Sequence, residues 1–302
     1  MKAVIQNRYG GPEVFELVDH EKPSPKDNQV LIEIHATNIA SGDKNVNTLE
    51  LSLPLKIIMK IIFGWSRPRN KIRGMTAAGE VVEIGKDVKQ YSVGDKVYFI
   101  NSMKAGCLAE YIALNENAVM APVPENISYI DAAPLSFGAM SAYHFINSNN
   151  INENDKVLIY GASGSVGSYA VQLAKYYGAS VTAVCSKKNH EAMISLGADH
   201  VIDYHTDDFR NMNKKYDVIF DAVMKITKSS SKKVLTENGK YLSIKMPTKE
   251  KRERLLIIND IVKEGKMKTL IDKVYPFNQF KEAHEHVYTG HKVGNVVIEI
   301  KK

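Results

Sequence analysis

The sequence predicts an α/β protein in which an irregular β domain precedes a doubly wound parallel sheet. From Met1 to about Leu114, short alternating segments such as "QVLIEIHAT" and "GDKVYFI" are separated by Gly, Pro, Asn and Asp turns. From residue 156, apolar strands such as "KVLIYG", "SVTAVCS" and "YDVIFDAV" alternate with helical patterns. The length, 302 residues, suits two domains of ordinary size.

Composition and charge exclude several classes of protein. The formal net charge is +6, but the lysines stand beside acidic residues and form no dense basic run, which argues against a nucleic-acid partner. No apolar run approaches the roughly 18 to 20 residues that span a membrane, and "MKAVIQNRYGGPEVFELV" lacks the apolar core of a signal peptide, so a cytosolic location is expected. Cys107 and Cys185 stand far apart in apolar contexts, which predicts buried free thiols.

The stretch 49–63, "LELSLPLKIIMKIIF", is strongly apolar and carries Lys56 and Lys60 four residues apart on one helical face. It predicts a helix that packs over a cleft in the β domain. The alternative is a helix that lies on a membrane surface.

The stretch "LIYGASGSVG" at 158–167 predicts a dinucleotide-binding turn. A strand ends in a tight turn there, and the helix that follows points its free N–H groups at the pyrophosphate. Ala162, Gly164 and Gly167 occupy the places of the G-x-G-x-x-G pattern, and the flanking strand–helix–strand context is the one it requires. A glycine turn used only for close packing is the alternative. The predicted cofactor-binding residues of this turn are Gly161, Ala162, Ser163, Gly164, Ser165, Val166 and Gly167.

The end of the second strand favours NADP(H) over NAD(H). No acidic residue that could accept bonds from a ribose 2′-OH occurs from Val171 through His190, and the strand runs instead into "SKKN". Ser186 can donate a hydrogen bond, and Lys187 and Lys188 supply positive charge for a 2′-phosphate. The alternative is that these are two ordinary loop lysines.

Several motifs in order make the chain resemble the zinc-independent quinone oxidoreductase (zeta-crystallin-like) branch of the medium-chain dehydrogenase/reductase superfamily. They are "NIASGD" at 38–43, "RGMTAAGEVVEIGKDVKQYSVGDKV" at 73–97, "GCLAEYIAL" at 106–114, "AAPLSFGAMSAYHFI" at 132–146, "GASGSVGSYAVQLAKYYGA" at 161–179, "SLGADHVIDY" at 195–204 and "KVGNVVIEI" at 292–300. The resemblance implies a GroES-like catalytic domain at 1–118, completed by 271–302, and a Rossmann NADP(H)-binding domain at 119–270, with the active cleft at their junction.

The resemblance also implies a reaction without zinc. Zinc-dependent members carry a Cys ligand in the loop that matches 38–43 and a His-Glu pair after the glycine that matches Gly74. This chain has Ser41, Gly42, Met75 and Thr76 at those places. Without a Lewis acid, the feasible reaction is hydride delivery from NADPH to a quinone or an α,β-unsaturated carbonyl compound.

By the same resemblance, Asn38 and Asp43 lie in the catalytic loop beside the nicotinamide and the substrate. Ser141 matches a hydroxyl that contacts the cofactor, Val223 lies beside the nicotinamide, and Tyr204 lies near the adenosine phosphate. Each has a plainer alternative in turns, caps or packing.

The chain departs from the family pattern in three places. Met224 and Lys225 replace a glycine pair, and Asn295 replaces a lysine that contacts phosphate. The segment near 245–251, "KMPTKEK", is shorter than in relatives, which predicts a sheet that lacks one element and leaves a homodimer an open alternative. In "AHEH" at 283–286, the two histidines are expected at the surface rather than on a metal.

A second hypothesis of another class remains open. The basic charge and the lack of an obvious catalytic acid also suit a nucleotide-binding protein with little turnover, which acts as a redox-sensing or nucleic-acid-binding module.

Overall fold

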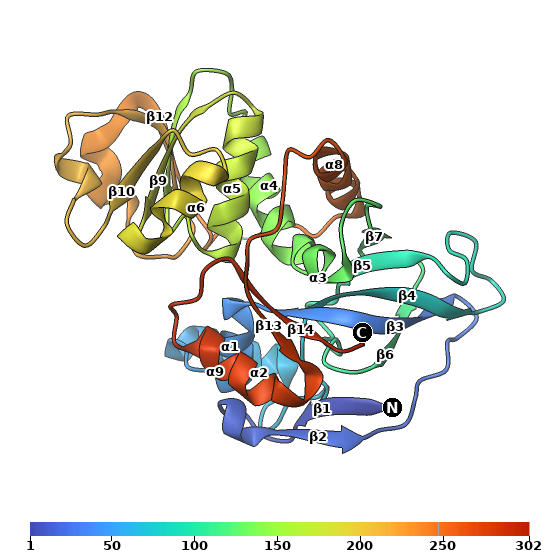
Figure 1. Cartoon of the computed structure of the whole chain (residues 1–302). Helices are drawn as coiled ribbons and strands as arrows, with labels where there is room; N and C mark the ends of the chain where they lie inside the picture. The colour runs from blue at the N-terminus through green and yellow to red at the C-terminus, as the bar shows by residue number, and fades with distance from the viewer. Residues whose placement is uncertain (247, 302) are drawn as a thin grey trace. The chain divides into compact units, whose positions relative to one another are not determined.

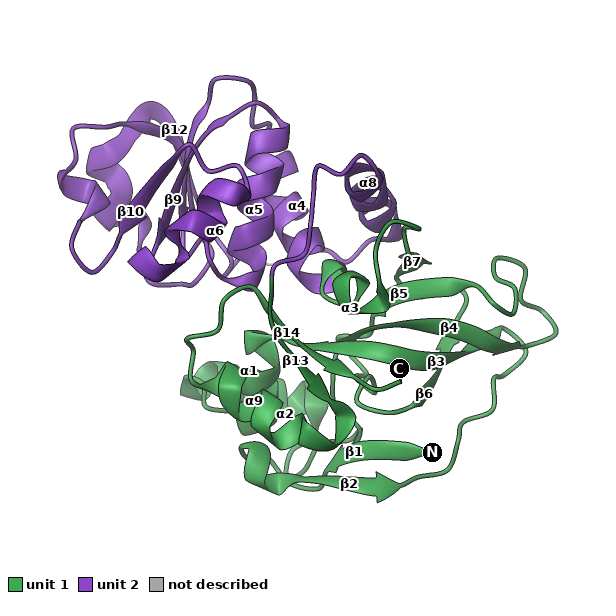
Figure 2. Cartoon of the chain, in the orientation of Figure 1, with its two compact units in different colours: residues 1–136, 271–302 green, residues 137–270 purple. Residues whose placement is uncertain are grey.

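The computed structural model describes residues 1–246 and 248–301. The chain forms two compact units, one from Met1–Ser136 together with Ile271–Lys302 and the other from Phe137–Leu270 (Figure 2). The second unit is therefore inserted between two parts of the first. The first limit falls at Ser136, where the sequence prediction placed it at residue 118, because α3 (Tyr129–Ala132) packs against strands of unit 1.

Unit 1 is organised around β3 (Gln29–Ile39), most of whose residues are buried. This strand pairs with three others, all antiparallel, and the sheet order is β13-β14-β3-β4-β5-β7 with β6 also on β3 (Figure 1). A separate antiparallel pair joins β1 (Lys2–Gln6) to β2 (Phe15–Asp19). The other strands of unit 1 are β4 (Thr76–Ile84), β5 (Lys96–Ile100), β6 (Tyr111–Asn115), β7 (Met120–Pro122), β13 (Ile271–Pro276) and β14 (Asn295–Glu299).

Besides α3, the α-helices of unit 1 in the described residues are α1 (Ser41–Thr48), α2 (Leu53–Phe63) and α9 (Phe280–Tyr288). Helix α9 buries Phe280, Ala283 and Val287 against β14 and the N-terminal strands. The sequence prediction for "AHEH" is half wrong: His284 is buried and bonds the carbonyl of Phe280 (2.7 Å), and only His286 is partly exposed. His284 lies within a turn of the apolar residues of α9, so it faces the core with them.

Unit 2 contains a parallel sheet in the order β10-β9-β8-β11-β12, the doubly wound arrangement that the alternating pattern predicts. Its strands are β8 (Lys156–Tyr160), β9 (Ser180–Cys185), β10 (His200–Asp203), β11 (Tyr216–Asp221) and β12 (Leu235–Ser243). The interiors of β8 and β9 are mostly apolar, with Val157, Leu158, Ile159, Val181, Ala183 and Val184 buried, because both faces of such a sheet are covered. Cys185 and, in unit 1, Cys107 are buried free thiols, as predicted.

The helices of unit 2 are α4 (Met140–Asn147), α5 (Ser165–Tyr176), α6 (His190–Ser195), α7 (Lys228–Ser231) and α8 (Arg252–Lys263). Helix α5 packs on β8 and β9 and also on α4, and α6 packs on β10 (Figure 1). Helix α5 follows β8 directly, so its first turn lies where the carboxyl end of that strand releases the chain.

After β12 the described chain enters α8 and then β13 of the other unit. Within residues 1–246 and 248–301, the sheet of unit 2 therefore has five strands and ends at β12, as the short segment near 245–251 predicts. Pro247, inside that segment, lies outside the described residues. No helix in the described part of the chain is both long enough and apolar enough to cross a membrane.

Candidate active site

The turn after β8 is built on Gly161 rather than on Ala162. Gly161 has a φ of +77°, the left-handed region that favours glycine, and a Cβ there would lie 2.4 Å from Cγ1 of Val223. Ala162, at the first place of the sequence pattern, is fully buried with ordinary geometry. The tight turn and the close contact with the β11 loop therefore both depend on the glycine one residue earlier.

Gly164 and Gly167 have different roles. A Cβ on Gly167 would lie 2.2 Å from the carbonyl oxygen of Gly161, so this glycine lets α5 pack close to the turn. A Cβ on Gly164 would meet only that same oxygen, at 3.4 Å, and otherwise open space. Gly164 is the residue that precedes α5, and in the described structure no side chain caps this end of the helix. The residues present therefore fit a pyrophosphate: the approach is open at Gly164, and the first turn of a twelve-residue helix faces it.

The loop after β9 is joined to this turn by one side chain. The amide of Asn189 donates to the hydroxyl oxygens of Ser163 (3.0 Å) and Ser186 (3.2 Å). Lys187 and Lys188 follow Ser186 in a single 3₁₀ turn and are both exposed. The structure thus brings Ser163 and Ser186 to one amide, and sequence reasoning missed Asn189, the buried residue that connects them.

The segment "CSKKN" at 185–189 contains no acidic side chain that could accept a hydrogen bond from a ribose 2′-OH. The acid paired with Cys185 across the strands is Asp203, at the end of β10. Its carboxylate already accepts the backbone N–H of His205 (3.0 Å) and is buried. The charged side chains that this loop offers to a ligand are therefore both cationic.

A buried aspartate at the end of β11 holds the loop that carries Val223. The Asp221 carboxylate accepts three backbone N–H groups, from Val223 (3.1 Å), Lys225 (3.2 Å) and Ile226 (3.2 Å). The Tyr241 hydroxyl donates to the same carboxylate (3.2 Å). Sequence reasoning missed this residue, although an acid at the end of the apolar strand "YDVIFD" was the signal.

Met224 occupies a strained position in that loop. Its φ is +60°, and the side chain is largely exposed. Met224 and Lys225 stand where the family pattern described above has a pair of glycines. The chain therefore keeps the left-handed turn while paying a steric cost that glycine would not incur.

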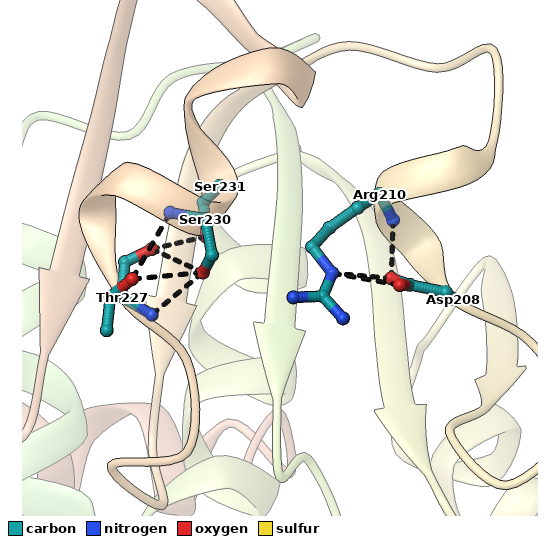
Figure 3. Close-up of polar contacts among 5 residues, drawn as sticks. All are labelled: Asp208, Arg210, Thr227, Ser230 and Ser231. Atoms are coloured by element: carbon teal, nitrogen blue, oxygen red, sulfur yellow. Dashed lines mark hydrogen bonds and ion pairs between the residues drawn. The ribbon is translucent and has the colours of Figure 1, made fainter.

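Tyr204 lines a cavity of about 250 Å³ beyond the end of β10, together with Tyr160, Arg210 and Ile226. The Arg210 guanidinium donates from Nε to both carboxylate oxygens of Asp208 (2.7 and 3.0 Å), which lowers the pKa of that carboxyl (Figure 3). Figure 3 also shows the turn in which Ser230 and Ser231 bond back to Thr227. Tyr204 itself is half exposed and its ring lies tilted against that of His205, so part of its surface is open to a ligand.

In unit 1, the structure buries Asn38 and Asp43 at the junction of β3 and α1. Among the described residues, neither polar atom of the Asn38 side chain has a hydrogen-bond partner, although the residue is 1% exposed. An unpaired amide in a protein interior costs free energy and is retained where a ligand completes it. Asn38 is therefore a candidate donor to a bound substrate.

Asp43 faces a cationic partner. Its carboxylate accepts the backbone N–H of Ala40 (2.8 Å), and burial raises its pKa to about 6 despite the opposing charge of Arg73. Arg73 is itself buried and donates to the side-chain oxygen of Asn47 (2.9 Å). The pKa of Asp43 is therefore well above that of an ordinary carboxyl. Sequence reasoning missed Arg73 and Asn47.

Ser141 lies in α4 of unit 2 and is nearly fully buried. The structure therefore brings one group of predicted residues together, namely the glycine turn, Ser186 and Val223. Asn38 and Asp43 form a second group within the other unit. Tyr204 belongs to neither group and lines the cavity at the end of β10.

The residues present do not fit a catalytic zinc ion. Zinc in proteins is bound by sets of Cys, His, Asp and Glu. Within residues 1–246 and 248–301, no three such side chains stand close enough together to hold a metal ion. Ser41, Gly42, Met75 and Thr76, at the places of zinc ligands in the resemblance, supply neither a thiolate nor an imidazole.

The chain belongs to the medium-chain dehydrogenase/reductase superfamily. Residues 26–153 match the alcohol dehydrogenase GroES-like domain, and residues 165–287 match the family described as zinc-binding dehydrogenase. The chain is 31% identical to the chloroplast envelope quinone oxidoreductase homolog of Arabidopsis thaliana, over 99% of this chain and 98% of that protein.

Two further similarities agree with this assignment. The NADPH-dependent alkenal/one oxidoreductase of Arabidopsis thaliana is 31% identical, over 99% of this chain and 79% of that protein. The structure of the quinone oxidoreductase from Coxiella burnetii superposes with a TM-score of 0.88 at 28% identity, covering 100% of this chain and 99% of that one. The chain is thus an oxidoreductase of this superfamily, related to quinone and alkenal/one oxidoreductases, and such relatives use a nicotinamide cofactor.

Proposed function

We propose that the protein is a zinc-independent reductase that uses NADPH to reduce quinones or α,β-unsaturated carbonyl compounds. The observation that carries the proposal is the open approach at Gly164, before an uncapped α5, joined through Asn189 to a loop that bears two lysines and no acid. This arrangement suits a dinucleotide with an additional phosphate on its adenosine ribose.

The choice of acceptor rests on the residues of unit 1. When bound, the reduced nicotinamide would supply a hydride, and a proton from water completes the reduction of the conjugated double bond or quinone. Negative charge develops on the acceptor's oxygen, and a fixed hydrogen-bond donor stabilises it. The unpaired amide of Asn38 is the donor that we assign to this role. The relatives named for quinone and alkenal/one substrates support the same class of acceptor.

The experiment that tests the cofactor is a titration of the protein with NADPH and, separately, with NADH, followed by nicotinamide fluorescence. Replacing Lys187 and Lys188 by alanine should raise the Kd for NADPH by about 30-fold, since each charge-assisted contact is worth about 1 kcal/mol when exposed. The Kd for NADH should stay unchanged. Equal losses for both dinucleotides would contradict the 2′-phosphate assignment.

Unit 2 offers a matched control for this pair. Lys232 and Lys233 are also adjacent, exposed and in a 3₁₀ turn. Replacing both by alanine changes the net charge by the same amount and should leave both Kd values unchanged. An equal loss of NADPH binding in this control would mean that overall charge, rather than a specific site, attracts the cofactor.

The reaction itself is tested by oxidation of NADPH with a quinone and with an enal as acceptors, with and without a chelator. Turnover that survives the chelator supports the zinc-free reaction, and its loss would contradict it. Tight NADPH binding without turnover of either acceptor would favour the alternative of a nucleotide-binding protein with little catalysis. We also propose a cytosolic location, which fractionation of the source cells would check.

A further inference from the structure

Helix α2 presents its apolar side chains to solvent. None of its eleven residues is buried, and the exposed large hydrophobic residues include Leu53 (71% exposed), Ile58 (51%) and Ile61 (59%). This differs from the sequence prediction of a helix packed over the β domain. We call the exposed apolar residues of this helix, together with Trp65 two residues after its end, the α2 surface; its members are Leu53, Leu55, Ile57, Ile58, Ile61, Ile62 and Trp65.

The helix is oriented opposite to an ordinary surface helix. Its partly buried residues are Lys56, Met59, Lys60 and Phe63, which recur at the spacing of one helical face. The lysines therefore lie on the more protected side, and the isoleucines on the exposed side. A globular protein normally turns its apolar stripe inward, so an apolar face left outward in this way marks an interaction surface.

Contacts of the neighbouring segment hold the helix in this orientation. The Tyr9 hydroxyl donates to the carbonyl of Gly64 (2.7 Å), directly after the helix. The Arg73 guanidinium lies 6.0 Å from the ring centre of Phe63, on the protected side. The end of α2 is thus anchored to unit 1 by its protected side while the apolar side stays uncovered.

The charge of the segment indicates what covers the α2 surface. Residues 51–72 contain five cations and no Asp or Glu, and all five are exposed or partly exposed; they are Lys56, Lys60, Arg67, Arg69 and Lys71. The loop at Lys104 joins them, because the side-chain amide of Asn70 donates to its carbonyl oxygen. The neighbouring Met103 is also largely exposed. Isoleucine, tryptophan and lysine or arginine side by side are the composition of a helix that lies in the interface of an anionic membrane.

The same charges argue against a second copy of the chain as the partner. In a two-fold dimer one surface patch meets itself, so the five cations of one copy would face the five of the other without an acid to pair them. A bilayer with acidic headgroups has the opposite charge and also receives the apolar side chains. The helix is about 16 Å long, too short for the roughly 30 Å of a bilayer core, so it would lie in the membrane plane.

The geometry points to the α2 surface as a docking site for the surface of an anionic lipid bilayer. The apolar side chains enter the acyl region, and the exposed cations Arg67, Arg69 and Lys71 bind the headgroups beside them, while Lys56 and Lys60 on the protected side add to the positive charge of the segment. The protein is thereby held at the membrane through unit 1, without a spanning segment. The inference concerns binding alone and stands whether or not the proposed reductase activity is correct.

The single tryptophan of the chain, Trp65, reports this binding directly, because it is 65% exposed at the end of the α2 surface. With the native protein, vesicles that contain phosphatidylglycerol should shift its emission to the blue and co-sediment the protein. Vesicles of phosphatidylcholine alone should bind at least about tenfold more weakly, and 0.5 M salt should weaken binding to the anionic vesicles. Absence of a shift and of co-sedimentation, or equal binding to both lipids, would overturn the inference.

Two substitutions on the helix separate the surface from the fold. Ile58→Glu with Ile61→Glu should lower vesicle partitioning about a hundredfold, since both side chains would otherwise enter the acyl region. Both residues are exposed, so the thermal unfolding midpoint should not change. Ile194→Glu, at an equally exposed isoleucine on α6, is the control for an added surface charge away from α2 and should leave partitioning unchanged.

The cations are tested in the same way. Arg67→Gln with Arg69→Gln should lower partitioning on anionic vesicles by about 30-fold, at about 1 kcal/mol per cation near the membrane. Lys86→Gln with Lys89→Gln, on an exposed turn of unit 1, is the charge-matched control. A dimer in sedimentation that Ile58→Glu and Ile61→Glu dissolve, with no vesicle binding by the native protein, would assign the surface to a second copy and overturn the inference.

Discussion

Two glycines of one turn should respond to substitution in opposite ways. At Gly167, alanine would place its Cβ 2.2 Å from the carbonyl oxygen of Gly161 and 2.8 Å from Cα of Ala162. Because both are backbone atoms, α5 must move away from the turn, and we expect a loss of about 3 kcal/mol in the free energy of unfolding. At Gly164, the nearest atom to a Cβ is 3.4 Å away, and the φ of −79° suits any residue. Gly164→Val should therefore change the unfolding free energy by no more than about 1 kcal/mol.

For cofactor binding, the substitution at Gly164 is the one with the large expected effect. A side chain at Gly164 stands where we place the pyrophosphate, and the loss of two charge-assisted hydrogen bonds at about 1.5 to 3 kcal/mol each raises the Kd for NADPH at least about a hundredfold. Urea unfolding and nicotinamide fluorescence measure the two effects on the same samples. Native-like NADPH binding by Gly164→Val, or native-like stability of Gly167→Ala, would contradict the roles assigned to these two glycines.

Three further predictions concern single side chains. Burial raises the pKa of Asp43 to about 6 from an ordinary 3.8, so its contribution to stability is complete below about pH 3.8 and is lost as pH rises through about 6. Asp43→Asn should then exceed the native protein in unfolding free energy by about 3 kcal/mol at pH 8 and match it near pH 4; a difference independent of pH would contradict this. Met224→Gly should stabilise the protein by about 1 kcal/mol by relieving a φ of +60°, and Met224→Ala, its control, should not. Asn38→Ala should lower kcat about tenfold or more while changing the Kd for NADPH and the unfolding free energy little, because its amide is unpaired in the described structure; unchanged kcat would leave Asn38 without a role in the reaction.

The sequence predicted those parts of the site that depend on local backbone geometry. Glycine spacing and strand–helix alternation are short-range signals, so the turn at 161–167, the five parallel strands and the position of "SKKN" beside the turn could all be anticipated. The choice between Ala162 and Gly161 as the turning residue could not, because it depends on which of them takes a positive φ.

Residues that act through contacts distant in sequence were missed. Arg73, in the segment before β4, donates to Asn47 of α1, and its charge acts on Asp43 of the same helix. Asp221 is completed by Tyr241 from the neighbouring strand. His284 was placed at the surface because polar residues are usually exposed, whereas it packs against the ring of Phe15 with the apolar face of α9. Helix α2 was predicted to pack on the β domain because apolar residues are usually buried, whereas its large apolar side chains are exposed.

The last strand of the chain has a consequence for the order in which the protein can assemble during synthesis. β14 pairs with β3, and Val297 stands opposite Asn38. Until the ribosome has made residues 295–299, that edge of β3 has no partner, although unit 2 is already complete in sequence. The inserted unit can therefore fold before the unit that surrounds it, and the residue assigned to the acceptor's oxygen reaches its final surroundings only when the end of the chain arrives. Deleting β14 should disturb the conformation of β3 around Asn38 and leave the dinucleotide-binding turn of unit 2 folded.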